Sequence, residues 1–511
     1  GGTVTLGGSG SLTLSNSANN LIREQQSGLT LVNGSDHTIQ GAGQIGDPSL
    51  LLVNQGQIIA NQAAGLSITA GSITNDGYLA AMAGSTLGIT ASTVTNNSVI
   101  MALAGAIALT GGTVIGGEVI AADGGTLTAS SSTILNDVNL IVNDSLSSAS
   151  IGGTITGSTI GVGGTLTLNG ATISDTVLAN YGIVNVSGGL NTMSGTLVNE
   201  AAGTMNIGSG SALEFEAGAA DSFANPGTIN VAATGALIID SAGDFAQYQV
   251  QTLTGGTYNI AGMFQFAGAD IVTNQADLAL AGSGVVEDGS LANGLRDFSD
   301  NGDQGQFSLL NGATFTSGGD FANSGAVTID AGSDFNAGAN TYTQTGGSTI
   351  VDGTLLAATI DLNGGDISGT GTLEGNLDNQ GDVDPGDAPG TLIIDGDYTQ
   401  SSSGVLNIEI DGASDFDRLA ISGDAELDGT LNVTFGGGFG PQNLETFTIM
   451  TFRSVSGDFT SMNPAGNWLE IRTTDSLSLE YILPEPSTWV LLAFGLMGLG
   501  WFRRCDSLRH D

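Results

Sequence analysis

The sequence predicts an all-β protein built as a parallel β-solenoid, and three observations lead to this fold class. Glycine accounts for 82 of the 511 residues, more than twice its average share of about 7%. Short stretches of alternating apolar and polar residues, each typical of a half-buried strand, recur along the chain. Between them returns a unit of the form apolar-x-Asn-x-Gly-x-apolar, and no long stretch before Pro486 has helical periodicity.

The Asn-x-Gly unit sets the predicted period. It occurs, with variations, at Asn54, Asn75, Asn96, Asn180, Asn225, Asn323 and Asn379, the first three at intervals of 21 residues. We expect equivalent asparagines to stack coil upon coil, and the Asn and Gly to supply the positive φ angles that turn each corner. The alternative is an antiparallel sandwich or barrel with hairpins at roughly 8–12-residue spacing. The fixed unit favours the solenoid.

The chain divides into three predicted parts. Residues 1–435 form the repeat region. Residues 436–483 are richer in aromatic residues and lack the Asn-x-Gly unit, so we expect a β-rich cap over the open strands of the last coil. Residues 484–511 carry an apolar segment and an arginine-containing tail. The chain starts in a strand-like stretch, "GGTVTLGG", without a signal peptide, so we expect its N-terminus to be truncated.

The charge balance limits the classes of partner. Only 11% of residues are charged, none is lysine, and the formal net charge is −42. Nucleic acids and anionic membranes are bound through basic groups, so we expect neither as a partner of the body. Cys505 is the single cysteine, which leaves no disulfide within the chain and no cysteine-ligated zinc site.

One region resembles the passenger-domain repeat of autotransporter-like bacterial surface proteins. The residues that carry the resemblance are Pro385, Gly386, Pro389, Gly390, Thr391, Leu392, Gly396, Tyr398 and Gln400, with Ala388 where the family has serine. The resemblance implies a right-handed, single-stranded parallel β-helix of adhesin-like type. An autotransporter also needs a long C-terminal β-barrel, and only residues 436–483 lie between the last solenoid-like strand and Pro484. Self-secretion is therefore not expected.

The end of the chain resembles the PEP-CTERM sorting signal of Gram-negative bacteria. It has Pro484, Glu485 and Pro486, then an uncharged run from 487 to 502, then Arg503 and Arg504. The resemblance implies processing by an exosortase, a membrane-embedded cysteine protease or transpeptidase, and export toward the cell surface or extracellular matrix. A plain tail anchor is the alternative.

The uncharged run also has a physical interpretation of its own. It predicts a transmembrane helix of roughly 24 Å, short of the roughly 30 Å hydrocarbon core of a bilayer. Arginines beyond it hold the tail in the cytoplasm and leave the acidic body outside the inner membrane.

Residues suited to catalysis are scarce. The two histidines are His37, in a turn, and His510, in the tail, so a Ser-His-Asp or Cys-His site is not expected. The stretch "GAGQIG" at 41–46 matches a dinucleotide-binding pattern but is followed by turn and strand, so we interpret it as a solenoid turn. Paired carboxylates for a glycosidase could come from "DISGTGTLEG" at 366–375 or from "DGASDFDRL" at 411–419. A lyase base is harder to find, because the arginines of the body lie singly.

Calcium is the one cofactor for which the sequence offers ligands. Asp382, Asp384 and Asp387 share one tight loop, and Asp411, Asp415 and Asp417 share another. Neither loop has the spacing of an EF-hand or of a calcium-binding β-roll, so solvated acidic turns are the preferred interpretation and no cofactor is predicted.

These inferences predict an exported, non-enzymatic β-solenoid with a structural or adhesive role at a bacterial surface or in a biofilm matrix. Its predicted partners are the exosortase, the inner membrane in transit, and exopolysaccharide or surface glycans. The alternative is a polysaccharide-active enzyme, a lyase or glycosidase, on the same scaffold.

Overall fold

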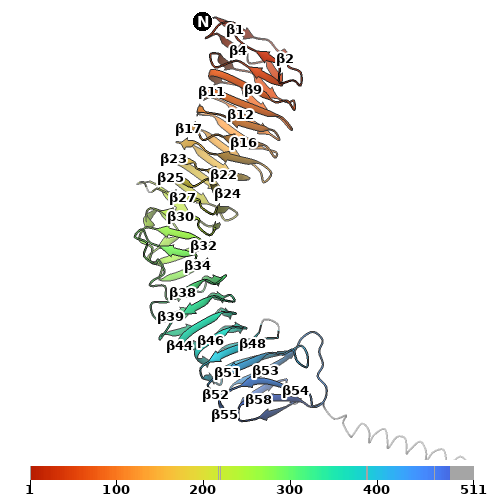
Figure 1. Cartoon of the computed structure of the whole chain (residues 1–511), viewed down its shortest axis with the longest axis vertical. Coiled ribbons are helices and arrows are strands. Elements are labelled where there is room, and N and C mark those ends of the chain that lie inside the picture. The colour runs from red at the N-terminus through yellow and green to blue at the C-terminus, as the bar shows by residue number, and fades with distance from the viewer. Residues whose placement is uncertain (1, 217, 219, 387–388, 465–466, 484–511) are drawn as a thin grey trace, which may run out of the picture. The chain divides into compact units, whose positions relative to one another are not determined.

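The computed structural model describes residues 2–216, 218, 220–386, 389–464 and 467–483. Two compact units make up the chain, unit 1 at Gly1–Gly318 and unit 2 at Gly319–Asp511. In the described residues the regular elements are short strands, with one 3-10 turn, η1 (Ala242–Asp244). Within each unit, strands of successive coils lie one upon another (Figure 1) and pair in parallel. The predicted parallel β-solenoid is confirmed; its right-handed sense stays a prediction.

The coils of unit 1 have three sides, each of which forms a parallel sheet. Sheet A contains β1 (Thr3–Leu6), β4 (Thr30–Asn33), β7 (Leu51–Asn54), β14 (Gly112–Ile115), β17 (Thr133–Asn136), β20 (Thr154–Thr156), β27 (Ala212–Phe215), β30 (Ala236–Ile239), β33 (Met263–Phe266) and β35 (Val285–Glu287). Sheet B contains β2 (Ser11–Thr13), β5 (Thr38–Gly41), β8 (Gln57–Ala60), β10 (Tyr78–Ala81), β12 (Val99–Leu103), β15 (Glu118–Ala122), β18 (Asn139–Val142), β21 (Thr159–Val162), β28 (Ser222–Ala224) and, later in the same position of the coil, β36 (Asp300–Asn301). Sheet C contains β3 (Leu21–Ile22), β6 (Gly43–Ile45), β13 (Ala106–Leu109), β16 (Thr126–Ala129), β19 (Ser148–Ile151), β22 (Thr165–Asn169), β24 (Ile183–Ser187), β26 (Thr204–Ile207), β29 (Thr228–Val231) and β37 (Gln306–Leu310).

Longer strands pass round a corner and contribute to two sheets of unit 1. They are β9 (Leu66–Asn75) and β11 (Thr86–Asn96) from C to A, β23 (Thr172–Asn180) and β25 (Leu190–Asn199) from A to B, and β32 (Thr252–Ile260) and β34 (Thr273–Ala281) from B to C. A short antiparallel partner of β32, β31 (Tyr248–Gln249), forms a hairpin with it, and β38 (Thr314–Thr316) completes the unit.

Unit 2 also has three parallel sheets. Sheet D contains β39 (Phe321–Asn323), β42 (Thr341–Gln344), β49 (Tyr398–Gln400), β52 (Asp424–Leu427) and β55 (Ser454–Gly457). Sheet E contains β40 (Ala326–Ile329), β43 (Ser348–Val351), β45 (Asp366–Gly369), β47 (Asp382–Pro385), β50 (Val405–Ile410), β53 (Thr430–Phe435) and β56 (Ser461–Asn463). Sheet F contains β41 (Asp334–Asn336), β48 (Thr391–Asp395), β51 (Arg418–Ile421) and β54 (Thr446–Thr451), and β44 (Thr354–Leu362) and β46 (Thr372–Asn379) pass from F to D. The last strands are β57 (Trp468–Arg472) and β58 (Ser476–Tyr481).

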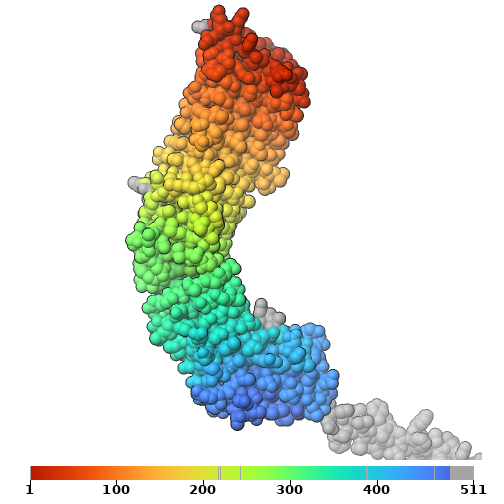
Figure 2. All heavy atoms as spheres, viewed as in Figure 1, coloured from red at the N-terminus to blue at the C-terminus, as the bar shows by residue number. Residues whose placement is uncertain are grey.

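The core consists of columns of inward-pointing side chains, and each coil contributes one residue to each column. In the first coils of unit 1 these residues are aliphatic, as in the column Leu52, Ile73 and Val94, whose exposed fractions are 1–3%. Later coils use aromatic residues, and Phe215, Phe223 and Phe245 meet edge to face at ring distances of 5.5 and 5.9 Å. Burying one such side chain contributes about 2 kcal/mol. On the face seen in Figure 2, the atoms of successive coils form a continuous surface within each unit.

The parallel stack does not end at residue 435, where we expected a separate cap to begin. β54, β55 and β56 still pair in parallel with the preceding coil. The last two strands, β57 and β58, depart from this stack, because β58 pairs antiparallel with both β54 and β57. A cap starting at residue 436 is therefore not supported. The helix predicted within residues 484–511 lies outside the described residues.

The corner glycines are required for a different reason than expected. Gly56, Gly77 and Gly227 of the Asn-x-Gly units do not have positive φ. A Cβ on Gly77 would lie 2.1 Å from the carbonyl oxygen of Gly56 in the coil before, and a Cβ on Gly227 would lie 2.2 Å from that of Glu200. The backbones of successive coils approach so closely at these corners that no side chain fits.

The asparagines stack, but in separate columns. Asn33, Asn54, Asn75 and Asn96 lie at the corner between sheets A and B. Asn180 and Asn199 end the sheet B halves of β23 and β25, so their column lies at the corner between sheets B and C. One sequence unit therefore serves two different corners.

Candidate functional site

The A–B column is a ladder of buried amides. Each asparagine Nδ2 donates to the Oδ1 of the next, at 2.8 Å for Asn33 to Asn54, 2.8 Å for Asn54 to Asn75 and 2.7 Å for Asn75 to Asn96. Each amide also donates to a main-chain carbonyl of the following coil, as Asn54 does to Tyr78. These side chains are 0–1% exposed. The ladder satisfies polar groups that would otherwise be buried unpaired.

His37 belongs to this ladder. Its Nδ1 lies 2.8 Å from Asn33 Oδ1, and the residue is 8% exposed. The sequence placed His37 in a turn and gave it no catalytic role. The structure adds that the imidazole is packed against the ladder. The glycines of 41–46 lie in β5 and β6 and the turns beside them, so the stretch is a solenoid turn as expected.

In unit 2 the motif of the autotransporter resemblance is part of the interior. Tyr398 and Gln400 both point into the coil, and the tyrosine hydroxyl donates to Gln400 Oε1 at 2.6 Å while accepting from Asn379 Nδ2 at 3.1 Å. Gln400 Nε2 in turn donates to the main-chain carbonyl oxygens of Gly404, Asp428 and Thr430. Burial raises the pKa of the Tyr398 hydroxyl. The Tyr-x-Gln pair thus acts as a structural element, and a ligand role is not needed to explain it.

The two acidic loops of unit 2 meet at Asp417. Its Oδ1 accepts the amide N–H of Gly390 at 2.9 Å, and its Oδ2 accepts that of Glu409 at 2.7 Å. The residue is 6% exposed, and burial raises the pKa of its carboxyl to about 6. Asp384 lies close enough to add to this rise, and burial raises the pKa of Asp384 as well. Sequence reasoning proposed the residues but not this contact between the loops.

In the part of the chain that the structure describes, no group of three or more His, Cys, Asp or Glu side chains converges as metal ligands would. Asp387 lies outside that part. Calcium binding stays untested. The carboxylates of the other candidate pair, Asp366 and Glu374, lie on β45 and β46 in sheets E and F, so they do not face each other across one sheet.

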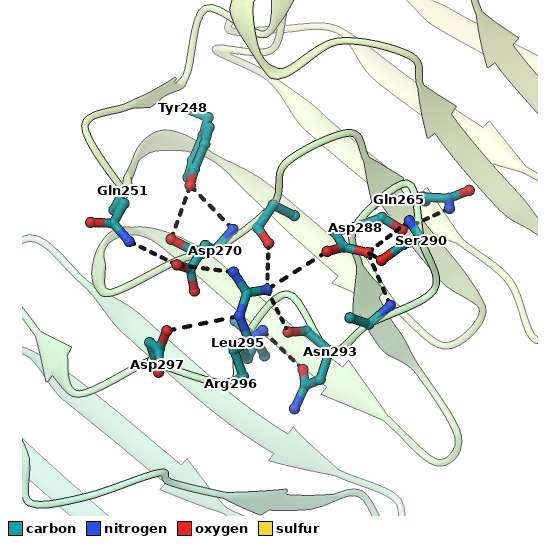
Figure 3. A network of polar contacts seen from close by, with 12 residues as sticks. Tyr248, Gln251, Gln265, Asp270, Asp288, Ser290, Asn293, Leu295, Arg296 and Asp297 are labelled. Carbon is teal, nitrogen blue, oxygen red and sulfur yellow. Dashed lines mark hydrogen bonds and ion pairs between the residues drawn. The ribbon is translucent and has the colours of Figure 1, made fainter.

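A polar network around Arg296 ties together irregular loops of unit 1 (Figure 3). Arg296 Nη2 lies 3.0 Å from Asp270 Oδ2, and Nη1 donates to the carbonyl oxygens of Ala269 and Asn293 at 3.0 and 3.2 Å. Gln251 Nε2 donates to the same Asp270 oxygen at 2.8 Å. The network joins the β31–β32 hairpin to the segments around residues 270 and 293.

The other side of the network is an acidic turn. Asp288 Oδ2 lies 3.9 Å from Arg296 Nη1, and its Oδ1 accepts the hydroxyl and amide of Ser290 at 2.7 and 2.8 Å. The Ser290 hydroxyl is the main cause that lowers the pKa of the Asp288 carboxyl. Arg453 and Arg472 are likewise paired, with Asp424 and with Asp458 and Glu470. These arginines are therefore engaged in structural pairs.

The predicted sorting residues Pro484, Glu485, Pro486, Arg503 and Arg504 lie outside the described residues, so the structure does not test them. The family model of the PEP-CTERM protein-sorting motif matches residues 483–504, a range that includes all five. No curated protein matches the chain in sequence. In the described residues no helix is long and apolar enough to cross a bilayer.

The motif and the fold together define a coarse function. The PEP-CTERM motif implies exosortase-dependent export and sorting to the cell surface. The sorted body is a parallel β-solenoid whose buried amides, tyrosines and glutamines bind one another.

Proposed function

We propose that the chain is a non-catalytic structural and adhesive element of the cell surface or extracellular matrix of a Gram-negative bacterium. The exosortase cleaves it near Pro484-Glu485-Pro486 while an apolar helix holds it in the inner membrane, with Arg503 and Arg504 on the cytoplasmic side. The observation that carries the proposal is a β-solenoid body attached to a sorting motif at residues 483–504. Surface or matrix glycans are the proposed adhesive partners.

The environment of the acidic residues supports a non-catalytic role. Asp417 has the raised pKa that a glycosidase acid needs. However, both of its oxygens accept backbone N–H groups and the side chain is 6% exposed, so it offers no proton to a substrate. Three of the five arginines of the body, Arg296, Arg453 and Arg472, are held in ion pairs, which makes these three poor candidates for the base or anion clamp of a lyase.

The sorting step is tested by replacing Pro484, Glu485 and Pro486 together with alanine. The expected result is full-length chain retained in the inner membrane, whereas the parent chain reaches the surface or medium without its C-terminal tail. Mass spectrometry of the released protein is the measurement. A released parent chain that still ends at Asp511 would show that the segment is a plain anchor.

The adhesive role is tested with a deletion strain. Loss of surface attachment or of matrix cohesion, restored by the parent gene, is expected. The alternative is tested by incubating the purified chain with acidic and neutral polysaccharides. New reducing ends or unsaturated products would establish a polysaccharide-active enzyme.

A further inference from the structure

An amide ladder also runs along the outside of unit 1. Asn185, Asn206, Asn230 and Asn259 occupy the same outward position in successive strands of sheet C, β24, β26, β29 and β32. Asn206 Nδ2 donates to Asn185 Oδ1 at 3.0 Å, Asn230 to Asn206 at 2.8 Å and Asn259 to Asn230 at 2.8 Å. Unlike the buried column, these side chains are half-buried or exposed.

The outer ladder keeps unused hydrogen-bonding capacity. A primary amide has two N–H donors and two acceptor lone pairs. A link to each neighbour uses one donor and one lone pair of Asn206 and of Asn230. The remaining N–H and lone pair of each are left for a partner in solution. Because strands stack at roughly 4.8 Å, such donor–acceptor pairs repeat at that interval along the sheet.

A hollow of about 350 Å³ lies beside this ladder. Two residues after Asn206, Asn230 and Asn259 the chain has a small apolar side chain or none, at Gly208, Ala232 and Ala261. Ala281 continues this second column in the next coil and Leu310 closes it. The hollow is lined by these residues and by Asn206, Asn230 and Asn259, and no charged side chain lines it. It therefore has an apolar floor with amides along one side.

We propose that the outer ladder and this hollow, the amide groove, bind an uncharged glycan chain; the proposal rests on the adhesive function proposed above. A sugar ring presents C–H groups, which pack on the apolar floor, and neighbouring hydroxyls, which pair with the N–H and C=O of an amide. The lining holds no cation to pair with a uronate or a phosphate. The formal net charge of −42 repels polyanions, so an uncharged polymer is the occupant that fits.

Unit 2 supplies a matched comparison. Asn432 Nδ2 donates to Asn407 Oδ1 at 3.0 Å and Asn463 Nδ2 to Asn432 Oδ1 at 3.1 Å, an outward ladder of the same kind on sheet E. Two residues after Asn407 and Asn432, however, stand Glu409 and Thr434 instead of small residues. This ladder has the amides without the small-residue floor.

The test is binding of uncharged hexasaccharides, cellohexaose and maltohexaose, and of an anionic alginate hexamer, to the purified full-length chain by titration calorimetry. At least one uncharged probe should bind, and alginate should bind at least tenfold more weakly. The double variant Asn206→Thr/Asn230→Thr removes the amides, and Ala232→Leu/Ala261→Leu fills the floor. Each should weaken binding at least tenfold, with an unchanged circular dichroism spectrum as evidence of folding.

The control variant Asn432→Thr in unit 2 should leave the affinity within twofold of the parent. Failure of both uncharged probes to bind, equal binding of alginate, or equal loss in the control would overturn the amide groove. Attachment of a strain that produces Asn206→Thr/Asn230→Thr separates the two proposals. A deletion strain that still attaches contradicts the adhesive function. The amide groove alone is contradicted by a different combination of results. In that case the deletion strain loses attachment, the strain with Asn206→Thr/Asn230→Thr still attaches, and the purified chain binds no glycan.

Discussion

In both units, buried polar side chains at a corner form hydrogen bonds from coil to coil, but the two units use different residues for this. At the A–B corner of unit 1, asparagine follows asparagine at intervals of 21 residues, and each amide bonds the next. At the D–E corner of unit 2, Asn379 is followed by Tyr398 and Gln400, and the bonds run from amide to hydroxyl to amide. A pure amide ladder needs every coil to bring the same side chain to the same place. In unit 2, Gln400 occupies the position that Asn379 has in the coil before, and the Tyr398 hydroxyl links the two amides.

The units also differ in how they hold acidic residues. In unit 1 the pKa values of Asp47, Asp144 and Asp288 are lowered, mainly by the hydroxyls of nearby serines. In unit 2 the pKa values of Asp361, Asp366, Asp384 and Asp417 are raised, mainly by burial. Asp277 and Asp424 are exceptions, one in each unit. Unit 1 keeps these acids in solvated turns, whereas unit 2 stacks several of them on its coils.

The largest expected effect comes from the corner glycines Gly77, at the A–B corner, and Gly227, at the B–C corner of unit 1. Gly77→Ala and Gly227→Ala each push a Cβ against a carbonyl oxygen of the coil before. Each should lower the free energy of unfolding by about 3 kcal/mol, the upper range for overpacking. Urea unfolding of the full-length chain measures this. Gly161→Ala is the control, because a Cβ there meets nothing within 4 Å. Equal stability of Gly77→Ala and Gly161→Ala would contradict the close approach.

Cutting the ladders tests whether the two chemistries are equivalent. Asn54→Ala removes the central link of the A–B column and leaves the Oδ1 of Asn75 without its donor. A cost of about 2 kcal/mol is expected for a buried polar group that loses its partner. Tyr398→Phe removes one hydroxyl between Asn379 and Gln400 and should cost about 1.5 kcal/mol. The exposed Asn97, which donates to Asp76, is the control: Asn97→Ala should change stability by under about 0.5 kcal/mol.

The acidic residues predict opposite responses to pH. Asp417 has a folded pKa of about 6, above its unfolded value, so folding opposes its ionisation. Stability is lost as pH rises through 6 and gained as pH falls. Unit 2 should therefore be about 1 kcal/mol more stable at pH 5 than at pH 7. The aspartates of unit 1 whose pKa values are lowered act in the other direction. Their contribution to stability is lost only when the pH falls below about 4.

Hydrogen exchange at pH 5 and 7, corrected for the intrinsic rate, resolves this difference by unit. Asp417→Asn should lose the dependence of unit 2 between these pH values, although it is less stable at both because an amide cannot accept both N–H groups. If the stability of unit 2 still depends on pH in this variant, the dependence comes from other carboxyls.

The smallest effect is expected at the network of Figure 3, which lies outside both ladders. Arg296→Gln removes the ion pair with Asp270 and the contacts with Asp288 and Asp297. Arg296 is 41% exposed, so the loss should be about 1 kcal/mol or less. Exchange should rise in residues 248–251 and 288–297 and stay unchanged along the A–B column. Faster exchange at Asn54 would show that the network supports the ladder after all.

Several features of the fold follow from the sequence alone. Alternation of apolar and polar residues fixes which side chains point inward, and the recurrence of Asn-x-Gly at 21-residue intervals fixes the length of the first coils. The interpretation of 41–46 as a turn follows in the same way, because it depends on local neighbours. The expectation that the chain has no histidine-based site stays a prediction. The motif at 483–504 is contiguous, so it too can be identified without coordinates.

Only the tertiary structure decided the rest, because it depends on which residues the coil period brings together. The same Asn-x-Gly unit lies at the A–B corner around Asn54 and at the B–C corner around Asn180, since the coils between them shift the unit by one side. The glycines are needed because of a carbonyl in the coil before, a neighbour some 20 residues away. The burial of Asp417 and the floor of the amide groove are also products of stacking. Residues distant in sequence become neighbours only when successive coils are in register.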